Sequence, residues 1–71
     1  MMNMPNQKIS QKIIYECKKQ SLTISKLAKL SRVSSSTISE IIKGTNQNPR
    51  MKTLIKISKG LGLSLKEFFT F

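Results

Sequence analysis

The sequence predicts a small all-α fold, and three observations support this prediction. Apolar residues recur at helical spacings of three and four along most of the chain. No segment shows the sustained alternation of apolar and polar residues that is typical of strands. Glycine and proline are sparse and stand at the ends of the periodic segments. With 71 residues, 38% of them hydrophobic, the chain can form one domain with a small core.

The first expected helix covers residues 6–20 and follows a short segment, residues 1–5, that is expected to be disordered. Three side chains in it recur every four residues and therefore share one face: Ile9, Ile13 and Cys17. This face is expected to pack on the rest of the domain, which we place at residues 6–71.

The second and third expected helices lie close together in the sequence. Thr23 is a favourable N-cap for the second, and the third is expected to begin at Ser34 or Ser35. Gly44 is expected to end the third helix, because glycine readily adopts the left-handed conformation found after helix C-termini. The side chains expected to face the interior from this region are Leu27, Ala28, Leu30, Val33, Ile38, Ile41 and Ile42.

Two further helices complete the predicted fold. The fourth covers about residues 50–59, and its apolar residues recur at spacings of three and four: Leu54, Ile57 and Leu61. The fifth opens with Ser64 and Glu67 at the spacing of a capping box, in which each side chain accepts a backbone hydrogen bond from the other residue. Phe68 and Phe69 follow directly.

The charge of the chain indicates a polyanionic partner. Thirteen Lys and Arg residues against three acidic ones give a net charge of +10, which favours nucleic acid first and an anionic membrane second. A lysine-rich coat that only maintains solubility is the alternative. A membrane-bound amphipathic peptide would need one long helix, which the glycine and proline positions interrupt. RNA binding would need aromatic residues interleaved with the basic ones, and these are missing.

Other functional classes lack the residues they need. The chain has no histidine and one cysteine, Cys17, so neither an internal disulfide nor a metal-ligand spacing is present. We expect no enzymatic activity, no cofactor and no metal site, because the usual general base, an acidic pair and a phosphate-binding glycine loop are all missing. The N-terminus has no apolar signal region, and no apolar run approaches the length of about 18 residues needed to span a bilayer. A cytoplasmic location is therefore expected.

The segment Thr23–Gly44, TISKLAKLSRVSSSTISEIIKG, resembles the helix-turn-helix of the lambda-repressor, Cro and Xre-type regulators. The downstream segment NPRMKTLIKISKGLGLSLKEFF is similar to the fourth and fifth helices of that family, so the resemblance covers about residues 12–69. It implies a compact five-helix lambda-repressor-like domain, with a helix-turn-helix at about 23–44. The recognition helix, about 34–43, would enter the major groove of DNA.

Several positions depart from the pattern of this family. Arg32 stands where the turn usually has glycine in a left-handed conformation, at a cost of about 1 kcal/mol. Two interpretations are open: Arg32 contacts a phosphate, or it only strains the turn. Ile24 replaces a frequent glutamine that would donate to phosphate. Cys17 and Ile42 stand where many relatives have a buried Arg–Glu pair, and replacing both partners together can be energetically neutral.

The resemblance also implies roles for individual residues. The expected base-contacting residues are Ser35, Ser36, Ser39, Glu40 and Lys43. The expected phosphate-contacting residues are Thr23, Arg32, Ser34, Thr37, Asn46, Gln47 and Arg50. The residues expected at a two-fold dimer interface are Leu65, Phe68, Phe69 and Phe71.

The base-contacting and dimer sets each have a simpler alternative. Glu40 either accepts a hydrogen bond from a cytosine amino group or forms a surface ion pair with Lys43 or Lys29. The serines of the third helix either contact bases or form a solvated face. Phe68 either contributes to a dimer interface or closes the core of the monomer.

The sequence therefore predicts a regulator that binds double-stranded DNA sequence-specifically. The resemblance implies a small Cro-like repressor of bacterial or phage origin, which associates with the nucleoid and binds an inverted-repeat operator as a homodimer. We expect no effector domain in these 71 residues, so regulation is expected through protein concentration, a regulatory protein partner or proteolysis. The alternative function is a protein-interaction module, or an antitoxin-like partner protein, that uses the Phe-rich C-terminal helix.

Overall fold

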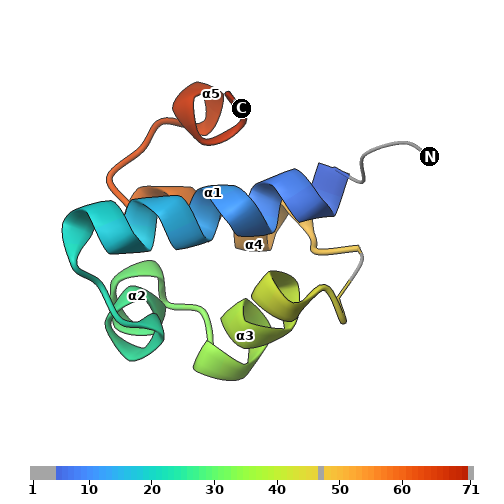
Figure 1. Ribbon diagram of the computed structural model, residues 1–71, viewed down its shortest axis with the longest axis horizontal. Helices are drawn as coiled ribbons and strands as arrows, with labels where there is room; N and C mark the ends of the chain where they lie inside the picture. Colours follow the sequence, from blue (N-terminus) through green and yellow to red (C-terminus); the bar gives the residue numbers. More distant parts are fainter. Residues whose placement is uncertain (1–4, 47, 71) are drawn as a thin grey trace.

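The computed structural model describes residues 5–46 and 48–70, and within this range it contains five helices and no strand (Figure 1). The helices are α1 (Pro5–Gln20), α2 (Ile24–Ser31), α3 (Ser35–Lys43), α4 (Met51–Gly60) and α5 (Leu65–Phe68). The predicted all-α class is confirmed. Of the segment expected to be disordered, residues 1–4 lie outside the described residues, and Pro5 is the first residue of α1.

Local capping interactions set most of the helix ends. The Thr23 hydroxyl accepts a hydrogen bond from the Lys26 backbone N–H, 3.1 Å, at the start of α2. At the C-terminus of α3, Gly44 has φ 83°, and its N–H donates to the Ile41 carbonyl. The predicted N-cap and glycine C-cap are both present, because each needs only residues within one helical turn.

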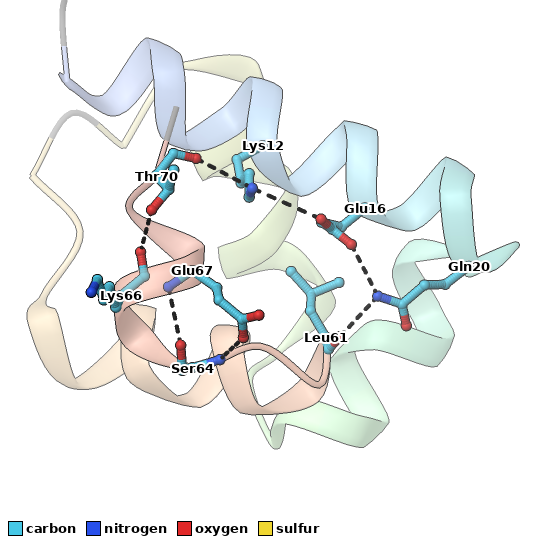
Figure 2. A network of polar contacts seen from close by, with 8 residues as sticks. All are labelled: Lys12, Glu16, Gln20, Leu61, Ser64, Lys66, Glu67 and Thr70. Carbon is cyan, nitrogen blue, oxygen red and sulfur yellow. Dashed lines mark hydrogen bonds and ion pairs between the residues drawn. The ribbon is translucent and has the colours of Figure 1, made fainter.

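The predicted capping box opens α5. The Ser64 backbone N–H donates to a carboxylate oxygen of Glu67, 2.8 Å, and the Glu67 N–H donates to the Ser64 hydroxyl, 3.1 Å (Figure 2). Hydrogen bonds from the Ser64 backbone and side chain lower the pKa of the Glu67 carboxyl, because they favour its charged form. This pair begins a helix of only four residues.

The hydrophobic core draws on all five helices. Its buried side chains are Ile9, Ile13, Leu27, Ile38, Ile41, Leu54, Ile57, Leu61 and Phe68. Seven partly buried residues pack against it, including Ala28, Val33, Ile42 and Cys17. Burial raises the pKa of the Cys17 thiol, with a smaller contribution from the nearby charge of Glu16. Cys17 and Ile42 therefore fill apolar positions, as expected for a pair that replaces a buried ion pair.

Leu30 is an exception to the predicted interior, because 51% of its surface is exposed. The inward side of α2 instead carries Leu27 and Ser31, both buried. Gly60 of α4 packs against Ser31 so closely that a Cβ on Gly60 would lie 2.8 Å from the Ser31 Cβ. The close contact of two small residues brings α4 against the Ser31 side of α2 and leaves Leu30 outside the core.

Phe68 is fully buried within the monomer. Phe68 therefore closes the core of the monomer, as the simpler alternative expects, and in this structure its ring has no exposed surface to offer a partner. The ring of Phe69 meets that of Phe68 edge to face, with centroids 5.3 Å apart. Leu65 is 39% exposed, while Phe71 lies outside the described residues.

A polar network ties α1 to the C-terminal part of the chain (Figure 2). At its centre is Glu16, a residue that is only 5% exposed and whose carboxylate lies 3.9 Å from the Lys12 ammonium. Gln20 donates both to Glu16, 3.3 Å, and to the Leu61 carbonyl, 2.8 Å. Lys12 also donates to the Thr70 carbonyl, 3.3 Å. These hydrogen bonds give the buried carboxylate its partners. They also hold α1 to Leu61, which precedes α5, and to Thr70, which follows it.

Candidate nucleic-acid interface

The candidate interface is formed by α2, α3 and the short turn between them. In Figure 1 these two helices lie on one side of α1, whereas α5 lies on the other side. Leu27, Ile38 and Ile41 anchor α2 and α3 to the core through their inner faces. The outer side of α3 is left with serine, glutamate and lysine side chains.

The turn between α2 and α3 is left-handed at Arg32. This residue has φ 59° and ψ 37°, and its backbone N–H bonds to the Ala28 carbonyl. Val33 donates to the same carbonyl, 3.2 Å, and Ser34 then caps α3 by accepting a bond from the Thr37 N–H, 3.1 Å. The expectation of a glycine-like conformation at Arg32 is confirmed. Most residues avoid this conformation because Cβ crowds the following carbonyl oxygen.

Arg32→Gly is expected to raise the free energy of unfolding by about 0.5–1 kcal/mol, because glycine adopts this conformation without steric strain. Urea unfolding of the purified domain measures the change. Ser21→Gly is a matched control, because Ser21 also has a positive φ of 57° and stands at the end of α1. Both variants should gain stability. A loss of stability in Arg32→Gly would mean that the arginine side chain stabilises the fold by more than its backbone strain costs.

A shallow depression of about 480 Å³ lies on the outer side of α3, and we call it the α3 hollow. Its lining residues are Ile24, Ser35, Ser36, Ser39, Glu40, Lys43 and Thr45. The structure therefore brings together all five residues expected to contact bases. It also adds Ile24, from the first turn of α2, and Thr45, from the loop after α3.

The sequence held partial signals for the two added residues. Ile24 follows the N-cap Thr23 directly and is an apolar departure from the family pattern, but only packing of α2 on α3 places it beside the serines. Thr45 follows the C-cap Gly44, and its hydroxyl donates to the Glu40 carbonyl, 3.2 Å. The backbone N–H groups of Thr45 and Asn46 donate to the same carbonyl, which fastens this loop to the end of α3.

Glu40 is exposed, and no ion pair joins it to Lys29 or Lys43 in the part of the chain that the structure describes. The described ion pair lies elsewhere, between Lys12 and Glu16. Glu40 thus lines the α3 hollow without a described ion pair to a lysine. Its carboxylate can accept hydrogen bonds from an amino group there, while Lys43, one turn further along α3, supplies a donor to the same hollow.

The residues expected to contact phosphates differ in how much of their hydrogen-bonding capacity is already used. The hydroxyls of Thr23 and Ser34 accept capping bonds, and that of Ser34 also donates to the Thr37 hydroxyl, 2.8 Å. Asn46 accepts a bond from the Asn48 N–H, 3.2 Å.

Arg50 is exposed, and its side chain makes no capping bond at the start of α4. Gln47 lies outside the described residues. Arg32 and Arg50 are the two charged residues of the set, and both are exposed.

A family model described as helix-turn-helix, of the Cro/C1/Xre type, matches residues 13–68, most of the chain. The protein therefore belongs to this helix-turn-helix family of DNA-binding transcriptional regulators, whose members are generally not enzymes. No curated protein and no solved structure gave a significant match.

Two further findings concern the described residues alone. Across residues 5–46 and 48–70, none of the helices has both the length and the apolar character that a membrane span requires. In the same ranges, no group of three or more His, Cys, Asp or Glu side chains is placed to bind a metal ion.

Proposed function

We propose that this protein is a small Cro-like repressor that binds an inverted-repeat operator as a dimer, with α3 in the major groove. The observation that carries the proposal is the α3 hollow, where hydroxyl, carboxylate and ammonium groups converge on the exposed side of one helix. An α-helix fits the major groove, where each base pair presents a distinct set of donors and acceptors. The proposed setting is the nucleoid of a bacterial cell.

The α3 hollow suits base reading better than simple charge attraction. Hydroxyl groups at Ser35, Ser36 and Ser39 can donate to or accept from base edges. Glu40 can accept from the amino group of cytosine, but phosphates repel its charge. A protein that only neutralised phosphates would gain nothing from a carboxylate at this place, so Glu40 supports sequence-specific binding.

Phosphate contacts are proposed around the hollow rather than within it. Arg32 and Arg50 are exposed on the chain segments that precede and follow α3. Arginine binds phosphate with a planar set of donors, and such contacts fix the register of a protein on the duplex. The net charge of +10 adds a general attraction that does not depend on sequence.

The proposed dimer would use the α5 surface. Leu65 is 39% exposed there, and Phe69 is half-buried beside it. A two-fold axis at this surface would set two α3 helices about one turn of DNA apart, which corresponds to an inverted repeat. The exposed Leu65 also favours the second candidate function, an antitoxin-like or other protein partner bound at α5.

The decisive experiment is selection of bound duplexes from a randomised DNA library at near-physiological salt, followed by sequencing. We expect an enriched inverted repeat with half-site centres about one helical turn apart. A single enriched half-site would support sequence-specific DNA binding and contradict the proposed dimer. The third outcome is binding that enriches no sequence and disappears as the salt concentration rises. It would mean that only charge attraction holds the protein to DNA, and protein binding at α5 would then be the better-supported function.

Glu40→Ala is expected to relax the preference at one base pair of each half-site by about 1 kcal/mol, roughly fivefold in relative affinity, because one base contact is lost. Competition binding with operators mutated at single positions measures this change. Arg50→Ala is the contrasting variant: it should weaken binding to all sequences equally and reduce the salt slope by about 1. An unchanged preference at every position in Glu40→Ala would remove the base-reading role of this residue.

A further inference from the structure

Ile24 is an apolar side chain on an otherwise polar surface. It is 36% exposed and lines the α3 hollow together with three serines, Glu40, Lys43 and Thr45. The other exposed large apolar residues of the described chain do not line this hollow: Ile14, Tyr15, Leu30, Met51 and Leu65. Scattered exposed apolar residues need no explanation, but one at the edge of a base-reading surface has a specific chemical counterpart.

That counterpart is the C5-methyl group of thymine. In the major groove, thymine presents this methyl group beside the O4 acceptor, whereas cytosine presents an amino donor and no methyl group. Serine hydroxyls and Lys43 can donate to O4, but hydroxyls accept as readily as they donate and so discriminate weakly. An apolar side chain contributes the discrimination that hydroxyls lack, because its contact is favourable only when it covers another apolar group.

Resting on the proposed DNA-reading function, we infer that Ile24 is a specificity-determining residue that recognises a thymine methyl group in each half-site. The fold supports this placement. Thr23 caps α2 and fixes its first turn, and Ile24 is the first residue of that turn. The packing of α2 on α3 then sets Ile24 beside Ser35, Ser36 and Ser39. One base pair in this hollow would meet donors from α3 and an apolar contact from α2.

Chemical removal of the methyl group isolates the inferred contact. Uracil has the same hydrogen-bonding edge as thymine and lacks only the C5-methyl group, so thymines of the selected operator can be replaced by uracil one position at a time. At one position of each half-site, the native protein should lose affinity about fourfold, the amount expected for one buried methyl group. Ile24→Ala should bind the thymine and uracil operators equally at that position.

Two variants guard against indirect effects. Ile24→Gln retains a side chain of similar size and removes the apolar contact, so it should also be insensitive to uracil even if alanine alters the fold. Leu30→Ala removes an exposed apolar side chain from the same helix, outside the hollow, and should keep the full sensitivity of the native protein. Thermal unfolding by circular dichroism verifies that each variant is folded.

The outcomes separate this inference from the function on which it rests. Loss of uracil sensitivity in both Ile24 variants, with sensitivity retained in Leu30→Ala, would establish the contact. A selected operator that no uracil substitution weakens, or equal sensitivity in the native protein and the Ile24 variants, would overturn the inference and leave the repressor function intact. Failure to select any operator would overturn both together.

Discussion

Phe68→Ala is expected to lower the free energy of unfolding by about 3–5 kcal/mol, the usual cost of removing a buried phenylalanine. Phe68 is fully buried and comes from α5, a helix of only four residues. The loss would approach the whole stability of a domain this small, which is about 5 kcal/mol or little more. Urea unfolding followed by circular dichroism measures the change.

Leu65→Ala is the matched control for Phe68, because it truncates an apolar residue in the same helix that is 39% exposed. Its effect on monomer stability should stay within about 0.5 kcal/mol. It should instead weaken dimer formation on DNA if α5 forms the proposed interface. A loss below about 1 kcal/mol in Phe68→Ala would be too small for a core residue and would contradict the burial of this ring.

Gly60→Ala is expected to destabilise the domain by about 2 kcal/mol, because overpacking of a close contact costs more than the helix gains. A Cβ at this position would lie 2.8 Å from the Ser31 Cβ and 3.0 Å from the Ser31 backbone N and Cα. Alanine by itself favours a helix over glycine by up to about 1 kcal/mol, so the two effects have opposite signs. The sign of the measured change in unfolding free energy shows which one dominates.

Lys59→Ala is the control for Gly60, because Lys59 is the preceding residue of α4 and is exposed. It should change stability little. A stabilised Gly60→Ala would mean that α2 and α4 separate at low cost. Because α2 carries the first half of the helix-turn-helix, Gly60→Ala should also weaken operator binding more than its stability loss alone explains.

The helix boundaries could be predicted from the sequence because the interactions that set them are short. Thr23, Ser34, Gly44 and the Ser64–Glu67 pair each form capping bonds within about one helical turn, so neighbouring residues suffice to identify them. The left-handed turn at Arg32 was predicted for a different reason. It followed from the resemblance of the segment to a known family, whose turn usually has glycine at that position.

The prediction failed where packing between distant segments decided the outcome. Leu30 has the correct spacing for a core residue, yet the close approach of Gly60 to Ser31 brings the other side of α2 against α4. Glu16 is a different case, because no prediction was made for it: its i,i+4 spacing to Lys12 is that of an ordinary surface pair. It is nevertheless buried, and Gln20 donates both to its carboxylate and to the carbonyl of Leu61, which lies 41 residues after Gln20.

The residues of the candidate site fall into the same two groups, those that could be named from the sequence and those that only packing brought to the site. The exposed polar side of α3 follows from helical periodicity, and the family resemblance singled out its residues, so five of the seven residues that line the α3 hollow could be named before the structure was known. The contributions of Ile24 and Thr45 depend on how α2 and the following loop pack around α3. By itself, the sequence determined the helices, their caps and the polar outer side of α3, because these depend on interactions within a turn. Only the tertiary structure decided which residues from other elements share that surface, because side chains from distant segments meet through the common core.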